Sequence, residues 1–288
     1  MRLFVVSMLL VFGFPFIMTD VVKTFKKCSQ FFFKDQPPVI PGILKNSVSK
    51  KQNQYKIICQ KYNNIHRYAT LYDITSKIPI FSAYKYTGHQ NGDRVPWMVE
   101  LKLEDLNAGM SEVCSNQACN RDYMNNKMDV NRGHLFPCCH AADQDTVAST
   151  FTLTNIVPQN INFNRGSWSR MEQTVGEFMN SHCSDENNPG EILAYVLTGA
   201  VPSTPPHILN NKVNIPSHMW TVFCCYNSKS KKYESQAHWA ENIDESKEEG
   251  KKIIIVKTLK ELQDFLKSKY NKVSSLFKND CLKSLEAE

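Results

Sequence analysis

One segment of this 288-residue chain, residues 129–172, carries polar side chains that folding alone does not require. It opens with the run NRGHLFP at 131–137, continues with NIVPQ at 155–159, and ends in the stretch from Asn164 through Trp168 to Glu172. A histidine, an arginine, several amides and a carboxylate in so short a stretch are the groups that hold a hard cation against a phosphodiester and activate water beside it. The segment therefore predicts a hydrolytic site.

The same segment resembles the active site of the DNA/RNA non-specific endonucleases of the ββα-metal type. Their pattern reads Asp-Arg-Gly-His-x-x-Pro, then Asn-x-x-Pro-Gln, then Asn-x-x-x-Trp-x-x-x-Glu, and these elements occur here in that order and spacing. The chain from about Cys28 to Leu262 is also similar to secreted endonuclease domain-containing 1-like proteins. One position departs from the pattern, because Asn131 stands where the family usually has Asp. The resemblance implies an α+β fold with a mainly antiparallel central sheet flanked by helices.

Four residues are expected to act on the phosphodiester. His134 is the expected general base, because a neutral imidazole can take a proton from water near pH 7. Arg132 can pair with phosphate oxygens and offset charge that develops in the transition state. The resemblance further implies that Arg94, in an Arg-x-x-Trp context, lies beside the scissile phosphate, and that Asn155 supports the metal site and the substrate.

The expected cofactor is Mg²⁺, or Mn²⁺, held by Asn164. Magnesium prefers oxygen ligands and keeps several waters, so one amide oxygen suffices when phosphate oxygens complete the coordination. On a regular helix the eight residues to Glu172 span about 12 Å, with about 80° of rotation between the two side chains. We therefore expect Glu172 to hold a water beside the cation rather than to ligate the cation itself.

The departure at Asn131 leaves two alternatives. If the Asp of the family is mainly a hydrogen-bond acceptor, Asn keeps one oxygen acceptor and activity is retained. If its charge tunes His134, the base is weaker. The nearby carboxylate of Asp129 favours retention.

The N-terminus predicts a secretory leader. Residues 4–18 are almost wholly apolar and follow Arg2, a length that suits a signal peptide better than a membrane span of about 20 residues. We expect residues 1–20 to be removed from a secreted, extracellular protein that then has no contact with the membrane. An uncleaved anchor is the alternative, since Ile17-Met18-Thr19 lacks a small-x-small cleavage pattern.

All ten cysteines follow this leader, and an even count in a secreted chain indicates disulfides. Cys114 and Cys119 could close a local loop. The adjacent pairs at 138–139 and 224–225 must each send their sulfurs to different partners. The alternative is a zinc site formed by the pair at 138–139 with His140, although adjacent cysteines lack the C-x-x-C spacing of such sites.

The length is within the range of one mixed α/β domain. After the leader we expect an N-terminal arm over residues 21–54, attached through Cys28, and a single endonuclease domain over residues 55–288 with a helix near its C-terminus. The expected elements are a hairpin of Arg67–Tyr72 and Ile78–Tyr86, strands over Thr150–Thr154, Ile192–Thr198, Met219–Tyr226 and Ile253–Val256, a helix from Trp168 to about Cys183, and a closing helix with Leu259, Leu262, Phe265 and Leu266 inside.

The leading hypothesis is a secreted, divalent-metal-dependent endonuclease that hydrolyses DNA and RNA. Little sequence specificity is expected, because contacts to phosphate carry no sequence information. The net charge of +6 is compatible with binding a polyanion but is too mild to predict it. Two alternatives share the scaffold: a weak or inactive secreted nucleic-acid-binding or interaction protein, suggested by Asn131, and a nucleotide phosphodiesterase with a small substrate.

Overall fold

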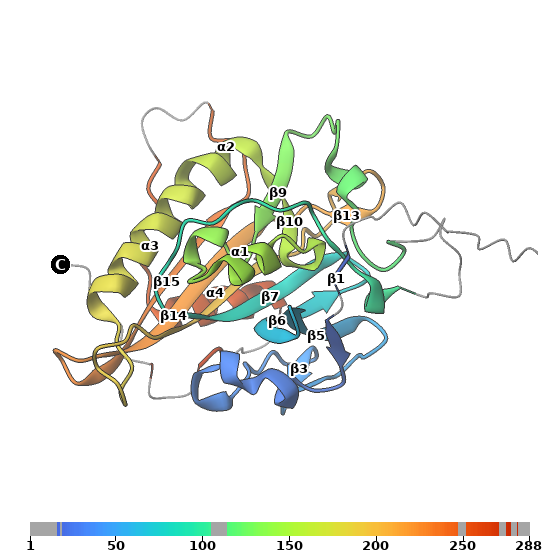
Figure 1. Cartoon of the computed structure of the whole chain (residues 1–288). Helices are drawn as coiled ribbons and strands as arrows, with labels where there is room; N and C mark the ends of the chain where they lie inside the picture. The colour runs from blue at the N-terminus through green and yellow to red at the C-terminus, as the bar shows by residue number, and fades with distance from the viewer. Residues whose placement is uncertain are drawn as a thin grey trace, which may run out of the picture.

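A seven-stranded antiparallel sheet runs through the middle of the molecule (Figure 1). The computed structural model describes residues 16–17, 19–104, 114–246, 252–270, 275–277 and 281. From one edge of the sheet to the other, the strands are β15 (Lys232–Glu241), β14 (His218–Asn227), β11 (Ala194–Val201), β7 (Ile78–Tyr86), β6 (Ile65–Asp73), β5 (Tyr55–Tyr62) and β2 (Asp20–Val22). The predicted hairpin is therefore present as β6 and β7, in the centre of the sheet.

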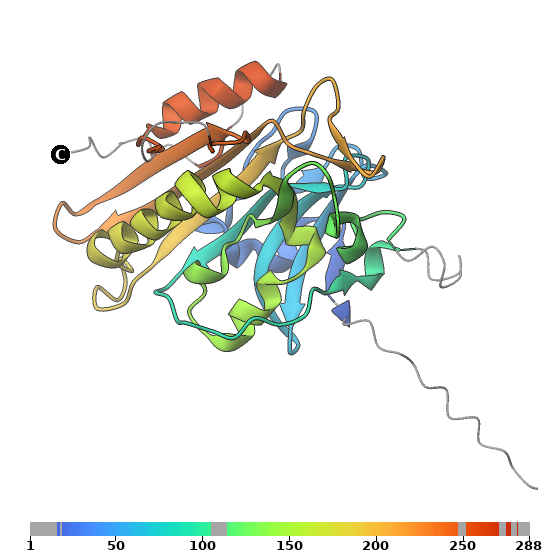
Figure 2. The same ribbon diagram turned by 90° about the horizontal axis from the view of Figure 1, so that it is seen from above.

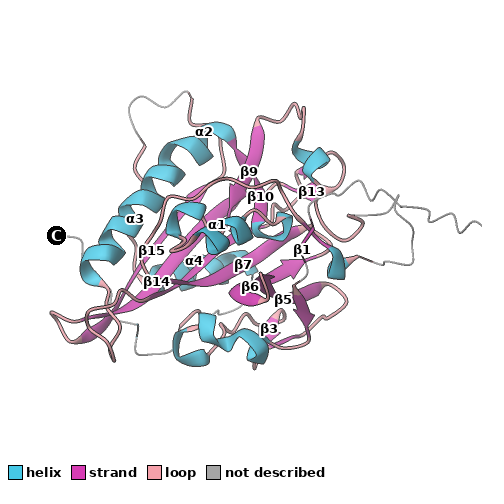
Figure 3. Cartoon of the chain, viewed as in Figure 1, coloured by secondary structure: helices cyan, strands magenta, loops and turns pink. Residues whose placement is uncertain are grey.

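Both faces of the sheet are covered, which is why every residue of β7 except Lys85 is buried. Figure 2 shows α3 (Ser169–His182) on one face and α4 (Leu259–Tyr270) on the other. The side chains of Trp168 and Met171 pack on the first face, and Leu262 on the second, in two separate apolar clusters. The predicted α+β class, with a mainly antiparallel sheet flanked by helices, is confirmed (Figure 3).

The strand β11 continues past its expected end at Thr198. Gly199 lies inside it, opposite Trp220 of β14. A Cβ atom at position 199 would lie 2.3 Å from the Trp220 ring. Glycine therefore leaves room for the indole ring here and does not end the strand.

The N-terminal segment is part of the same core. Cys28 forms a disulfide with Cys59 of β5, so the predicted attachment through Cys28 is present. Phe25 and Leu44 are fully buried in the cluster that also holds α4. The segment comprises η1 (Phe25–Phe31), η2 (Phe33–Asp35), β3 (Leu44–Lys45) and β4 (Val48–Ser49).

Most of the predicted signal peptide, residues 1–15 and 18, lies outside the described residues. The last residue of the expected leader, Asp20, is part of the sheet. It begins β2, and its carboxylate lies 2.8 Å from Nζ of Lys61. The structure thus places Asp20 in the folded sheet. Within the described part of the chain, no helix has both the length and the apolar character needed to cross a membrane.

The segment singled out in the sequence forms a ββα unit on the face of the sheet that carries α3. β9 (Val130–His134) pairs antiparallel with β10 (Ile156–Asn160), and the chain then enters α2 (Ile161–Phe163). A π-helical turn, η8 (Asn164–Trp168), leads into α3. The predicted helix from Trp168 to about Cys183 is thereby confirmed.

The predicted strand over residues 150–154 is wrong. These residues end α1 (Gln144–Thr150) and enter η7 (Leu153–Asn155), and all five are buried. The side chain of Asp143 caps α1 by accepting from the backbone N of Thr146. Buried threonine hydroxyls then donate to carbonyls of the preceding turn, as from Thr152 Oγ1 to Ser149 O at 2.9 Å, so the alternation of apolar residues with Thr does not mark a half-exposed strand.

The strand predicted at 253–256 is also not formed. The segment runs beside β15, but only Lys257 makes a β-bridge, to Ala237. The predicted closing helix is confirmed as α4. The remaining described elements are β1 (Phe16–Ile17), β8 (Val99–Glu100), η3 (Leu101–Leu103), η5 (Asn120–Tyr123), η6 (Cys138–His140), β12 (Ile208–Leu209) and β13 (Val213–Asn214).

Four disulfides join described cysteines. Cys114–Cys119 closes the expected local loop, and the adjacent cysteines at 224–225 bond to different partners, Cys281 and Cys183, as expected. The same expectation for the pair at 138–139 is wrong, because the other eight cysteines are paired with one another and these two are left as thiols.

Candidate active site

His134 ends β9, and its imidazole is held between aromatic rings. Its ring centroid lies 5.3 Å from that of Trp97 and 5.1 Å from that of Phe151. Among the described residues none hydrogen-bonds the ring, and its Nε2 is buried without a partner. Burial, with a contribution from the charge of Arg94, lowers the pKa of His134 to about 4. The imidazole is therefore neutral at pH 7 and able to accept a proton.

The two predicted arginines differ in how they are held. Arg132 is partly buried, and its guanidinium lies over Trp97 at 5.5 Å and Tyr123 at 5.3 Å from the ring centroids. Its Nη2 donates to the backbone O of Asn120 at 2.9 Å. Arg94 is exposed, and its charge acts on His134. Arg132 is thus fixed in the wall of the site, whereas Arg94 faces solvent.

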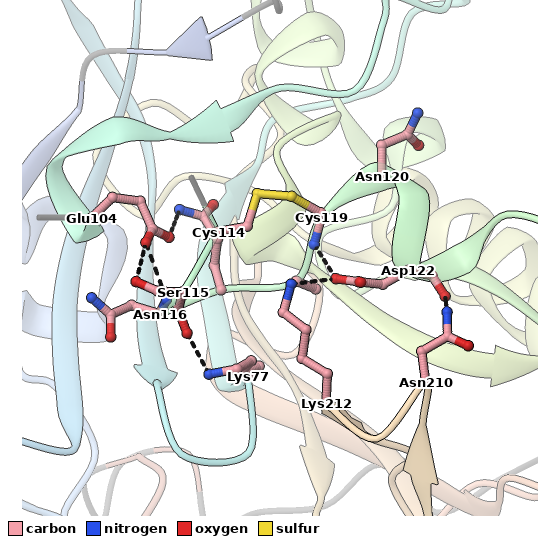
Figure 4. A network of polar contacts seen from close by, with 12 residues as sticks. Lys77, Glu104, Cys114, Ser115, Asn116, Cys119, Asn120, Asp122, Asn210 and Lys212 are labelled. Carbon is pink, nitrogen blue, oxygen red and sulfur yellow. Dashed lines mark hydrogen bonds and ion pairs between the residues drawn. A yellow bond between two sulfur atoms is a disulfide. The ribbon is translucent and has the colours of Figure 1, made fainter. Parts of the chain in front are cut away.

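The loop that holds Arg132 is itself anchored to the body (Figure 4). The Cys114–Cys119 disulfide closes it, and the carboxylate of Asp122 accepts from the backbone N of Cys119 at 2.6 Å. Nζ of Lys212 lies 2.7 Å from the same carboxylate. These contacts fix η5, the turn that supplies the Tyr123 ring and the Asn120 carbonyl to Arg132.

The amides of Asn131 and Asn164 meet although 33 residues separate them. Asn164 Nδ2 donates to Asn131 Oδ1 at 2.6 Å. Because the amide nitrogen of Asn164 faces Asn131, its oxygen is turned elsewhere, and no described residue donates a hydrogen bond to it. The predicted metal ligand therefore presents an oxygen that a cation could use.

The regular helix assumed between Asn164 and Glu172 is not formed. The chain makes the π-helical turn η8, and Gly166 within it has the non-helical angles φ −99° and ψ −114°. Distances calculated for a regular helix therefore do not apply to this pair.

Glu172 lies in the first turn of α3. Trp168 is buried in the core, and it donates from Nε1 to Glu172 Oε1 at 2.9 Å. Burial raises the pKa of Glu172 to about 8, against the hydrogen bond from Trp168, which lowers it. In the absence of a cation the carboxyl is mostly protonated at neutral pH.

Asn155 differs from its expected role as a substrate contact. Its side chain is fully buried, and Oδ1 accepts from the backbone N of Phe136 at 3.0 Å and from Ser82 at 2.9 Å. Its Nδ2 donates to the carbonyls of Phe136 and Thr150. With both ends of the amide engaged, Asn155 joins the loop after His134 to the sheet and does not reach solvent.

His140 has a supporting role that the sequence did not indicate. Its ring is buried, with Nε2 donating to the backbone O of Glu172 at 2.8 Å and Nδ1 2.8 Å from the Tyr84 hydroxyl. Burial lowers the pKa of His140 to about 4. Both ring nitrogens are used, so the zinc site considered for the pair at 138–139 with His140 lacks its histidine.

A small cavity lies beside this histidine, between α3 and the sheet. Its volume is about 10 Å³, enough for about one water, and its lining includes Tyr84, His140, Glu172 and Thr198. Thr198 in turn hydrogen-bonds Thr221 across the sheet at 2.9 Å. A line of buried polar groups thus connects the central strands with Glu172. No local pattern in the sequence signals this arrangement, because its residues come from segments that are distant in the chain.

The donor set fits a hydrated hard cation. The described part of the chain has no group of three or more His, Cys, Asp or Glu side chains that could hold a metal ion. One amide oxygen, from Asn164, is sufficient as the protein ligand of Mg²⁺ or Mn²⁺ when waters and phosphate oxygens supply the other ligands. Zinc, which takes several nitrogen or sulfur ligands from the protein, does not fit.

Several proteins with a related sequence have names that contain the word nuclease or endonuclease. The chain is 30% identical over 215 residues to the human Endonuclease domain-containing 1 protein, and 29% identical over 220 residues to its mouse counterpart. Each alignment covers 70% of this chain and 39% of the relative, so the chain spans about two fifths of their length. It is also 32% identical over 108 residues, 36% of this chain and 31% of the relative, to the mitochondrial nuclease EXOG of Danio rerio.

Structure comparison gives the same fold. The EndoG chain of the EndoG/EndoGI complex superposes with a TM-score of 0.51 at 18% identity, over 73% of this chain and 83% of that one. The predicted ββα-metal nuclease fold is thereby confirmed. Residues 47–272 match the sequence model of the DNA/RNA non-specific endonucleases. The chain belongs to the DNA/RNA non-specific endonuclease family.

Proposed function

We propose that the chain is a secreted, divalent-metal-dependent endonuclease that hydrolyses phosphodiester bonds of DNA and RNA with little sequence specificity. The observation that carries the proposal is the state of His134. Its imidazole is neutral at pH 7 and has no hydrogen bond to any described residue, and it lies at the end of the first strand of the ββα unit in a chain of this family. A histidine needed only for packing would be expected to have its buried ring nitrogen satisfied.

In this proposal His134 takes the proton from the attacking water. Asn164 would hold Mg²⁺ or Mn²⁺, and when bound the cation supplies Lewis-acid stabilisation of charge on the phosphate and the leaving oxygen. Glu172 orients water next to the cation position and is itself held by Trp168. Asn155 acts behind the site, by fixing the loop that follows His134.

The arginines neutralise the phosphate. Arg94 is exposed and can approach a phosphate oxygen, while Arg132 contributes charge from a fixed position. Both recognise the nucleic-acid backbone, which is common to all sequences, so cleavage is expected at many sites in DNA and RNA. The four disulfides favour an oxidising compartment and support secretion.

The test is digestion of supercoiled plasmid and of structured RNA by the purified protein. With Mg²⁺ we expect both polymers to be degraded to a broad distribution of fragments, and chelation to stop the reaction. The matched control is His134→Ala purified in the same way, which excludes a contaminating nuclease.

Two other outcomes would contradict the proposal. Intact polymers after long incubation with several divalent ions, together with retention of the polymer on the protein, would indicate a nucleic-acid-binding protein. Hydrolysis of small phosphodiesters with the polymers left intact would indicate a nucleotide phosphodiesterase.

A further inference from the structure

The contact between Asn131 and Asn164 has chemistry that a carboxylate at position 131 would not have. Asn131 lies in β9, opposite Gln159 of β10, and Asn164 begins η8. The 2.6 Å bond from Asn164 Nδ2 is the one hydrogen bond that a described residue makes with the Asn131 side chain. Nothing else in the described chain therefore fixes which end of the Asn131 amide faces Asn164.

A carboxylate can only accept hydrogen bonds at neutral pH, so Asp at position 131 would force Asn164 to turn its nitrogen inward and its oxygen outward. An amide both donates and accepts. If the two amides of the pair rotate together, Asn131 Nδ2 donates to Asn164 Oδ1, and this reversed bond again joins an amide nitrogen to an amide oxygen. In the reversed arrangement the Asn164 oxygen is occupied and its nitrogen faces the cation position.

We propose that Asn131 is a positioning residue that sets the affinity of this chain for its cation by allowing both orientations of Asn164. This inference rests on the proposed function, because it takes Asn164 as the metal ligand. Only one orientation can bind Mg²⁺, and a site that is competent for part of the time has an affinity lowered by that fraction. The neutral amide also lacks the negative charge that a carboxylate would add near a divalent cation.

The test measures Mg²⁺ binding directly, without cleavage. A cation that binds only the folded protein raises its melting temperature as its concentration exceeds the dissociation constant. The full chain and three variants are titrated with Mg²⁺ after treatment with a chelator. Asn131→Asp allows one orientation of Asn164, Asn131→Leu removes both hydrogen-bonding groups, and Arg165→Gln is the charge control.

Arg165 is a matched control because it is exposed and directly follows Asn164. Its replacement by Gln changes the net charge by the same single unit as Asn131→Asp but leaves the amide pair intact. Melting temperatures in chelator show whether each variant is folded. A further readout is the side-chain NH₂ signal of Asn164 in nitrogen-15 NMR spectra, which reports the hydrogen bond itself.

We expect Asn131→Asp to lower the Mg²⁺ dissociation constant by about tenfold or more, the size of effect usual for residues that orient a metal ligand. Arg165→Gln should change it by less than about threefold, since a solvent-exposed charge is screened. Asn131→Leu should raise it by about tenfold. A dissociation constant of Asn131→Asp equal to that of the parent or of Arg165→Gln would overturn the inference.

Cleavage assays on the same samples separate this inference from the proposed function. If the parent cleaves DNA with Mg²⁺ and Asn131→Asp binds Mg²⁺ no better, the inference fails and the proposed function stands. If the parent neither binds Mg²⁺ nor cleaves, but Asn131→Asp does both, the inference is supported and nuclease activity of the natural chain is refuted. If neither protein binds Mg²⁺, both proposals fail.

Discussion

Burial determines the protonation of the two titratable residues on which the proposed chemistry depends. His134 and Glu172 both lose hydration, which lowers the pKa of the imidazole to about 4 and raises that of the carboxyl to about 8. Both groups are therefore uncharged at neutral pH in the cation-free protein. For His134 this is the form a general base needs; for Glu172, binding of a cation would be accompanied by release of a proton.

The raised pKa of Glu172 predicts a pH dependence of stability in the cation-free protein. The unfolded carboxyl titrates near 4.5 and the folded one near 8, so its contribution is complete below about pH 4.5 and is lost as pH rises through about 8. Between about pH 6.5 and 8 the parent should lose at most about 2 kcal/mol relative to Glu172→Gln, at about 1.4 kcal/mol per pH unit. Urea unfolding in chelator at several pH values measures this.

The buried histidines do not affect the comparison of stability between the parent and Glu172→Gln. His134 and His140 have lowered pKa values near 4, so their contributions are complete above about pH 6.5 and are lost only as the pH falls toward 4. They are also the same in both proteins. Parallel stability curves for the parent and Glu172→Gln between pH 6.5 and 8 would show that Glu172 is ionised in the folded protein.

Asn155 provides a second test on a single residue. Because its side chain is fully buried, we expect it to support the fold and not to contact the substrate. Asn155→Ala leaves the backbone groups of Phe136 and the carbonyl of Thr150 without their partner, which should reduce the free energy of unfolding by about 3 kcal/mol. Urea denaturation gives this value. Unchanged stability with lost cleavage would instead restore the original expectation that Asn155 contacts the substrate.

From the sequence, His134, Asn164 and Glu172 could be named as candidate site residues, because the motif itself carries the chemistry. The hydrogen bond from Asn164 to Asn131, the burial of Asn155 and the support of Glu172 by His140 could not, since each depends on contacts between segments that are distant in the chain. Side-chain type and local spacing contain no information about such partners.

Among the secondary-structure elements, the turn η6 differs most from expectation, because its two cysteines were expected to form disulfides. Its cysteines at 138–139 remain thiols, while the next residue, His140, bonds the backbone of α3. Strands and helices with strong apolar periodicity were predicted correctly, as for β14 and α3. The segment at 150–154 was not, because buried hydroxyls that bond within a helix resemble the polar half of a strand pattern.

The thiols of η6 give a count that can be checked. We expect alkylation of the denatured, non-reduced protein to find two thiols, at Cys138 and Cys139. Mass spectrometry of the labelled peptides identifies the positions. Absence of both thiols, or labels on any of the eight paired cysteines, would contradict the disulfide pattern described above.

At the scale of the whole molecule, one antiparallel sheet supports the site from behind and joins it to the disulfide-bonded remainder. β7 and β11 supply Tyr84 and Thr198 to the polar line beneath Glu172, and α4 covers the opposite face. The class of the fold followed from the resemblance to the family, and the hairpin of β6 and β7 followed from residue patterning. The position of the N-terminal segment within the core did not, because short 3₁₀ turns and two-residue strands have no periodicity that marks their packing.

The proposed hydrolysis depends on His134 as the base of a metal-dependent nuclease, and single-turnover cleavage of plasmid by His134→Ala at saturating Mg²⁺ isolates this role. We expect a rate about 10² to 10⁴ lower than that of the parent. The affinity for DNA and the rise in melting temperature with Mg²⁺ should be unchanged, and excess Mg²⁺ should not restore the rate. Cleavage by His134→Ala at the parental rate, or recovery of that rate with excess Mg²⁺, would contradict the assignment of His134 as the base.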